Sequence, residues 1–215
     1  MSESPYRADL PPVPWRLRNR PIHRGYPVPW FVATVDGVPD FRIVDAGKFR
    51  PAIEQRLCWL CGNPLGVHLA FPIGPMCAVN RVNSEPPSHR ECAEWALAGC
   101  PFLTQRESGY RSAGLPEGVS EPAGMPITRQ PGAGCLWITK SFRPFRVGDG
   151  VLFHLGTPTS VTWWREGRAA TRAEVLASID SGYPILLAAA EQEGPDAIRE
   201  LEIARERAMA LLPAA

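Results

Sequence analysis

Short apolar runs separated by turn residues fill the first and the third quarter of the chain. Residues 30–35 and 38–44 flank Asp36-Gly37, the preferred two-residue hairpin turn, so we expect a β-hairpin there. Residues 142–147 and 150–155 predict a second hairpin across Gly148-Asp149-Gly150. Two further runs have the same strand-like character: 135–139 and 160–164.

The pattern then changes to a helical one. Thr171 followed by Glu174 is a capping-box sequence, which predicts a helix that begins there and stops at Gly182. Pro184 and Pro195 are each placed to start another helix. In the last of these helices the apolar residues recur on one face: Ile198, Leu201, Ala204, Ala208 and Leu211. We therefore expect three packing helices at the end of the chain.

Composition places the chain among globular proteins, with 45% hydrophobic and 21% charged residues. A formal net charge of +1 gives no overall attraction to nucleic acid or to an anionic membrane. The first residues have neither a basic nor an apolar leader segment, and the most apolar stretch, 183–190, is too short to cross a bilayer. We expect a cytoplasmic protein without membrane contact, in which cysteines stay reduced.

Two segments carry fewer structural signals. Residues 1–28 are rich in proline and place four arginines near Trp15, which favours an extended arm. Such an arm packs along its own domain, or it binds a nucleic-acid backbone or a partner's groove. Residues 101–134 are rich in glycine and proline and predict a flexible loop. That loop either orders on a partner, covers a site or stays mobile.

Cysteine spacing supplies the strongest chemical signal. Cys58 and Cys61 form a C-x2-C pair, which brings two thiolates within reach of one ion. Ser88 and Glu91 have the capping-box spacing, so we expect a helix that begins at His89 and carries His89 and Cys92 on one face. The four residues make a Cys3His set. Cys77 lies between the two pairs and is either a buried small hydrophobe or a ligand in place of His89.

The residues between the two pairs read as a short hairpin, with strands at 66–71 and 76–79 and a Pro/Gly turn at 72–75. A knuckle, a hairpin and a helix whose first turn carries two ligands resemble the treble-clef zinc finger over residues 58–99. The resemblance implies one tetrahedral, structural Zn2+ bound by Cys58, Cys61, His89 and Cys92. Residues 58–103 also resemble uncharacterised proteins of prophage-rich bacterial genomes.

We thus expect an α+β fold, in which the N-terminal hairpin and the strands of 135–164 form one antiparallel sheet under a C-terminal helical layer. The treble-clef zinc module lies between the two sheet segments. The expected organisation has four parts: an arm with a hairpin at 1–57, the zinc module at 58–100, the flexible loop at 101–134, and strands followed by three helices at 135–215.

Signatures of nucleotide loops, serine hydrolases and zinc proteases are absent from the sequence. One enzymatic alternative rests on a resemblance to HNH endonucleases, in which His68, followed by Pro72, is the general base, and Asn80 and His89 come next in order. The favoured hypothesis is a zinc-stabilised, non-enzymatic binding or adaptor protein that contacts another protein, and the prophage resemblance adds that it is phage- or mobile-element-related. Nucleic-acid binding is the remaining alternative.

Overall fold

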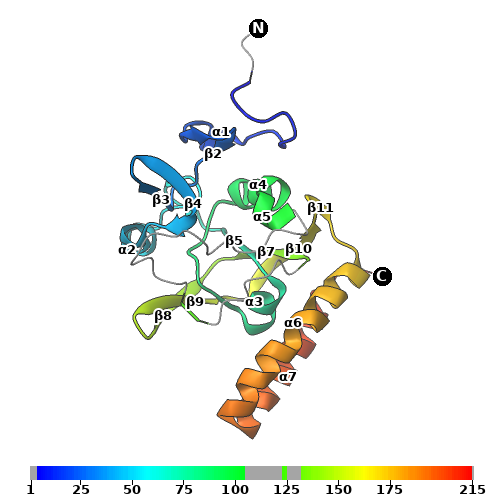
Figure 1. Ribbon diagram of the computed structural model, residues 1–215. Coiled ribbons are helices and arrows are strands. Elements are labelled where there is room, and N and C mark those ends of the chain that lie inside the picture. The colour runs from blue at the N-terminus through cyan, green and yellow to red at the C-terminus, as the bar shows by residue number, and fades with distance from the viewer. Residues whose placement is uncertain (1–3, 105–122, 125–131, 215) are drawn as a thin grey trace.

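The chain folds around a four-stranded antiparallel sheet in the order β11-β10-β7-β5. The computed structural model describes residues 4–104, 123–124 and 132–214. The four strands span Leu69–Ile73 (β5), Gly134–Thr139 (β7), Pro158–Arg165 (β10) and Arg168–Ala169 (β11). Because β5 is an edge strand, it tolerates Pro72, which has no N–H to donate. Figure 1 shows helices on both faces of this sheet.

Side chains that alternate along the strands form two cores. Leu69 and Phe71 on β5 and Trp137 on β7 pack on one face with α3 (Pro75–Asn80), α6 (Arg172–Glu193) and α7 (Pro195–Met209). Leu136 and Ile138 point the other way and pack with α4 (Arg90–Gly99). The predicted strand at 135–139 is confirmed, and its nearly continuous apolar sequence reflects burial on both faces.

Smaller sheets lie around this centre. They consist of β1 (Ile22–His23) with β2 (Tyr26–Pro27), β3 (Val32–Val35) with β4 (Val38–Val44), and β6 (Val82–Asn83) with β9 (Gly150–Leu155) and β8 (Phe142–Val147). Both predicted hairpins are confirmed, and Asp36 and Gly37 adopt the positive φ angles that their turn requires. However, β3 and β4 pair only with each other among the described residues. The expectation of one sheet is therefore wrong for this hairpin. It is also wrong for β8 and β9, which belong to a sheet with β6 and not to the main sheet.

The edge position in the main sheet belongs instead to β5, which comes from the predicted zinc module. The expected second strand at 76–79 is also wrong, because these residues form helix α3. Pro75 occupies the first turn of α3, where its fixed φ angle favours a helix and its missing N–H costs nothing. A short apolar run does not distinguish a buried strand from a buried helix, and here the proline decides the outcome.

The C-terminal layer contains two helices rather than three. Helix α6 continues through Gly182 and Pro184 to Glu193, and Gly194 then joins it to α7, so that the two lie side by side in Figure 1. Gly182 does not end the helix. A Cβ atom there would lie 2.9 Å from Cγ and Sδ of Met76, so the glycine allows α3 to approach closely.

By length and composition alone, the longer α6 is a candidate membrane span. Core helices of soluble proteins have the same length and composition. The uninterrupted apolar run 183–190 within α6 is still too short to cross a bilayer. Within the fold, α6 packs against both α3 and α7.

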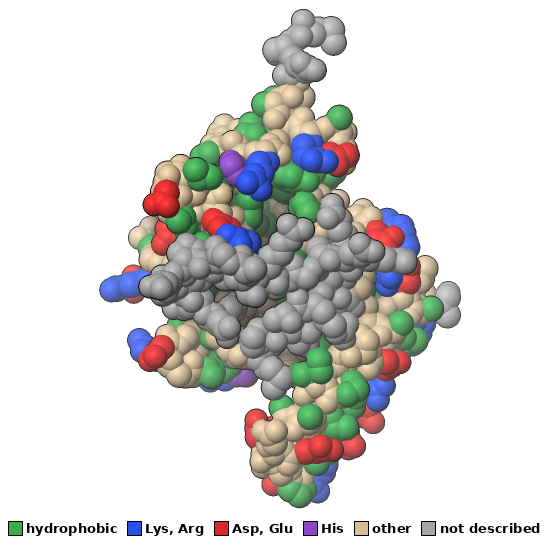
Figure 2. All heavy atoms as spheres, in the orientation of Figure 1, with side chains coloured by type: hydrophobic (Ala, Val, Ile, Leu, Met, Phe, Trp, Pro, Cys, Tyr) green, Lys and Arg blue, Asp and Glu red, His purple; other side chains and the backbone are tan. Residues whose placement is uncertain are grey.

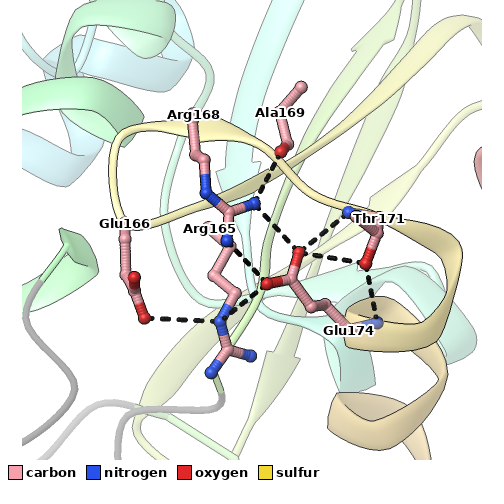
Figure 3. A network of polar contacts seen from close by, with 6 residues as sticks. All are labelled: Arg165, Glu166, Arg168, Ala169, Thr171 and Glu174. Carbon is pink, nitrogen blue, oxygen red and sulfur yellow. Dashed lines mark hydrogen bonds and ion pairs between the residues drawn. The ribbon is translucent and has the colours of Figure 1, made fainter.

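The predicted capping box at the start of α6 is confirmed. The Thr171 hydroxyl accepts a hydrogen bond from the Glu174 amide, and the Glu174 carboxylate accepts one from the Thr171 amide. Figure 3 shows that the same carboxylate also accepts two hydrogen bonds from Arg168, while Arg165 lies beside it. Hydrogen bonds from Arg168 hold the pKa of Glu174 low, at about 2. This network fixes α6 to the end of the sheet.

The N-terminal arm packs along its own domain. Val13 and Leu17 are buried against the predicted zinc module, and Trp95 of α4 donates its indole N–H to the Pro11 carbonyl. The arm is not extended throughout, because it contains α1 (Trp15–Arg18) and the β1–β2 hairpin. Two short helices, η1 (Ala46–Lys48) and α2 (Phe49–Glu54), then lead to Cys58.

The predicted loop at 101–134 lies mostly outside the described residues. Its first residues form the short helix α5 (Pro101–Thr104), and Gly134 already belongs to β7. On the face drawn in Figure 2, the basic and acidic side chains of the described residues are intermixed and form no patch of one charge. This agrees with the formal net charge of +1.

Candidate metal centre

The first ligand pair lies on a tight knuckle that its own backbone hydrogen bonds define. The Cys58 amide donates to the Asn63 carbonyl at 2.8 Å, and the Gly62 amide donates to the Cys58 carbonyl at 2.8 Å. Gly62 has a φ angle of 79°, a conformation that favours glycine. The Cys61 amide points at the Cys58 sulfur, 3.5 Å away. The knuckle therefore presents both thiols in one direction.

The second pair comes from the start of α4. This helix begins at Arg90, one residue later than expected. His89 is the N-cap residue and Cys92 lies in the first turn. The capping box predicted from Ser88 and Glu91 does not form. The Ser88 backbone instead pairs with Ala70 of β5, and the Glu91 carboxylate accepts a hydrogen bond from Arg16 at 2.6 Å.

These elements bring all four predicted ligands together. The potential ligand atoms of Cys58, Cys61, His89 and Cys92 all lie within 4.8 Å of one another. A tetrahedral zinc site with Zn–S bonds of about 2.3 Å has sulfur atoms about 3.8 Å apart, so the cluster has the dimensions of a single ion. The side chains are buried, with exposed fractions of 0%, 5%, 7% and 0%. The four residues are thus positioned to hold one metal ion.

Hydrogen bonding fixes which imidazole nitrogen faces the cluster. Nε2 of His89 lies 3.0 Å from the Pro64 carbonyl oxygen. That oxygen can only accept a hydrogen bond, so we assign the proton to Nε2. Nδ1, 3.3 Å from the Cys61 sulfur, is then free to act as a ligand. Metal-binding histidines are commonly oriented in this way by a carbonyl behind the ring. The sequence gives no sign of this role for Pro64.

The electrostatics of the cluster favour a thiolate at Cys58. Burial alone raises the pKa of Cys58, but hydrogen bonds involving Cys61, Cys92 and His89 lower it on balance. The pKa of Cys92 is raised, chiefly because its thiol hydrogen bonds to Cys58. Burial lowers the pKa of His89, whereas hydrogen bonds to the two knuckle thiols raise it more, to about 10. In the absence of an ion Nδ1 therefore also carries a proton, which a bound metal would displace. Thiolate is the form of cysteine that binds metals.

The remaining cysteines lie apart from this cluster. Cys77, the alternative ligand, belongs to α3, and burial raises the pKa of its thiol to about 11. Burial also raises the pKa of Cys100 and Cys135. All six cysteines are free of disulfide bonds. Among the described residues, no second group of cysteine, histidine or acidic side chains is close enough to bind an ion.

The structure brings together only two of the three residues of the nuclease alternative. His68 is exposed, precedes β5 and lines a hollow beside the metal cluster together with His89. Asn80 ends α3 and lines a different, smaller cavity against α7. His89, the third residue of that alternative, belongs to the metal cluster. Between the ligand pairs the chain forms strand β5, helix α3 and the short strand β6, and β6 pairs with β9. The described residues therefore do not show β5 and β6 as the strand pair of a ββα unit.

An aromatic cluster joins the knuckle to the N-terminal part of the fold. Trp59, 1% exposed, stacks on Phe31 with ring centroids 5.3 Å apart and contacts Phe49 at 4.7 Å. Trp30 meets it edge-on and covers Gly62, where a Cβ atom would lie 2.7 Å from the indole ring. Hydrophobicity marks these residues as core, but their convergence on the knuckle follows only from the tertiary structure. The metal cluster therefore lies at the junction of the arm, the β3–β4 hairpin and α4.

Comparisons with models of known protein families, with curated proteins and with solved structures found no match to this chain.

Proposed function

We propose that this chain is a zinc-stabilised, non-enzymatic binding protein whose partner is another protein. The observation that carries this proposal is the buried set of three thiols and one imidazole. Sets of this kind form closed structural zinc sites, whereas catalytic zinc keeps a position open for water or substrate. One Zn2+ bound by Cys58, Cys61, His89 and Cys92 would stabilise the junction of the surrounding elements.

We further propose that residues 58–99 are a variant of the treble clef. The knuckle and the first turn of α4 carry the ligands, as in that module. Ala70 and Ser88 exchange two backbone hydrogen bonds of 2.9 and 2.7 Å, which supports a minimal antiparallel pairing ahead of the helix. Helix α3 and strand β6 occupy the place of the hairpin turn. In this variant β5 is also the edge strand of the main sheet, so the zinc module contributes to the hydrophobic core around that sheet.

A protein partner is preferred to nucleic acid because the surface charge is balanced. The basic and acidic residues number 23 and 22, and many arginines already pair with carboxylates, as Arg16 does with Glu91. Nucleic-acid binding draws most of its affinity from several cations that contact phosphates at once. Protein interfaces instead rely on a few buried aromatic, aliphatic and arginine side chains.

The proposal is tested by photo-crosslinking in the native host, with a photoreactive amino acid at exposed Val67 and, as a control, at exposed Val147 on β8. We expect the photoreactive residue at position 67 to crosslink to one protein. The same adduct should form with that protein after purification, and chelation of zinc should abolish it. Adducts only to nucleic acid, or the same adducts from both positions, would contradict a specific protein partner. The zinc content of the purified protein tests the metal separately.

A further inference from the structure

A small cavity lies where the end of α3 packs against the C-terminal part of α7. Its volume is about 110 Å³. Because a water molecule occupies about 30 Å³ in the liquid, this space holds about three or four waters or one small oxyanion. The apolar part of its wall consists of buried residues of the core beside the main sheet: Ala78, Val79 and Ala208. None of the four metal ligands lines it.

The charged residues that line this cavity are both basic. Arg81 directly follows α3, and Arg207 lies in the last turn of α7. Asn80 adds a side-chain amide, and no acidic residue lines the cavity. Two helices thus bring two positive charges to one small space, and the lining offers no negative charge to balance them.

Arg207 has no acidic partner in the part of the chain that the structure describes. Its side chain forms neither an ion pair nor a hydrogen bond with a described residue. By contrast, Arg205 on the same helix pairs with Asp180 at 2.8 Å. The positions three and four residues away from Arg207, where a helical partner would lie, hold no acid: Ile203, Ala204, Ala210 and Leu211. Arg207 therefore keeps its positive charge unpaired beside the cavity.

Arg81 occupies a position where the backbone favours glycine. It is the C-cap residue of α3 and has a φ angle of 54°, in the left-handed region. Its guanidinium carbon lies 5.5 Å from the centre of the Trp137 ring, and the side chain forms no ion pair with a described carboxylate. Neither the backbone nor an ion pair explains an arginine here, whereas binding of an anion requires its charge.

We propose that this cavity binds a phosphate-type oxyanion between Arg81 and Arg207, with the amide of Asn80 as a further donor. Guanidinium groups donate paired hydrogen bonds to the oxygens of such anions. The apolar wall excludes water from one side of the cavity, which strengthens the attraction between the charges. Neither zinc nor the protein partner takes part in this binding, so it goes beyond the proposed function.

The two arginines also have a simpler structural role to distinguish. Both lie at the C-terminal end of a helix, where a positive charge interacts favourably with the helix dipole. That role stabilises the fold equally with and without an anion. Anion binding differs from it, because added phosphate should stabilise the parent protein and should do so less once either arginine is replaced.

The experiment uses inorganic phosphate and the full-length, zinc-loaded protein. Isothermal titration calorimetry measures binding, and urea unfolding is compared in phosphate and in chloride at equal ionic strength. We expect saturable binding and a higher urea midpoint in phosphate. Binding should weaken about tenfold or more in Arg81→Gly and in Arg207→Gln, the effect of losing one charged donor. Because glycine suits the backbone at position 81, Arg81→Gly should remain folded in chloride.

Two matched controls change arginines that do not line the cavity. Arg24 has a φ angle of 53° and lies in the N-terminal arm, so Arg24→Gly makes the same backbone change elsewhere. Arg199→Gln removes a positive charge from α7 outside the cavity. Both variants should bind phosphate as the parent does. Phenyl phosphate is titrated in parallel. Equal binding assigns the cavity to the phosphate group of a larger molecule, and binding of inorganic phosphate alone assigns it to the free ion.

Three outcomes would overturn the inference. These are no saturable binding of phosphate, equal binding by the parent and both cavity variants, and the same loss of binding in the control variants. If Arg207→Gln lowers stability by the same amount in phosphate and in chloride, the arginine only stabilises the end of the helix. None of these results bears on the protein partner or on zinc, so the two proposals fail separately.

Discussion

Gly62 offers a quantitative test of how tightly the knuckle packs against the N-terminal part of the chain. In Gly62→Ala, a residue with a side chain must adopt a φ angle of 79°, at a cost of about 1 kcal/mol. The new Cβ atom would also lie 2.7 and 2.8 Å from two atoms of the Trp30 ring, which must then move. Overpacking of this kind costs about 1–3 kcal/mol. We therefore expect a total loss of about 2–4 kcal/mol in the free energy of unfolding.

Two other glycines separate these contributions. Gly37 has a φ angle of 80° and no atom within 4 Å of a built Cβ, so Gly37→Ala should show the strain alone. Gly66 has neither a positive φ angle nor a Cβ contact, so Gly66→Ala should be neutral or slightly stabilising. Urea unfolding of the zinc-loaded proteins, followed by circular dichroism, measures all three. Equal stability of Gly62→Ala and Gly37→Ala would refute the packing of Trp30 on the knuckle.

Three further predictions concern the metal, a helix cap and a partly buried acid. Cys58→Ser and Cys92→Ser should lose zinc and most of their folded structure, whereas Cys77→Ser should keep both; full zinc in Cys92→Ser, by elemental analysis, would show that the ligand set is wrong. Thr171→Ala should lower stability to urea by about 1 kcal/mol, and an unchanged midpoint would contradict the cap. Burial raises the pKa of Glu85 from 4.5 to about 7, so the folded chain keeps a proton that the unfolded chain loses first. Stability should fall as the pH rises through this interval, and Glu85→Gln should reduce the fall; an identical pH profile for the two proteins would exclude the raised pKa.

Local signals in the sequence predicted local structure well. Asp36-Gly37 fixes a hairpin because few other residues accept its turn conformation. Thr171 and Glu174 form a capping box because the side chain of each accepts a hydrogen bond from the backbone amide of the other. The C-x2-C pair and the spacing of His89 and Cys92 likewise identified the residues that the structure brings together. Within each motif the paired residues lie a few positions apart, although the two ligand pairs themselves are separated by 28 residues. The local geometry of each motif therefore depends little on the rest of the chain.

The failures arose where distant residues decided the outcome. Ser88 and Glu91 have the spacing of a capping box. However, the Ser88 backbone pairs with Ala70 of β5, and the Glu91 carboxylate accepts a hydrogen bond from Arg16. Glycine often ends a helix, but Gly182 lies inside the continuous helix α6, where the absence of a side chain allows close packing against Met76. The pairing of β5 with β7 joins segments more than sixty residues apart, and nothing local specifies it.

The most direct test of the account is zinc X-ray absorption spectroscopy on protein purified from its native host. We expect one zinc per chain, with three sulfur ligands at about 2.3 Å and one nitrogen at about 2.0–2.1 Å. His89→Cys should convert this to four sulfur ligands without loss of the ion. A folded protein without zinc, or a spectrum with an oxygen ligand from water, would contradict a closed structural site formed by Cys58, Cys61, His89 and Cys92.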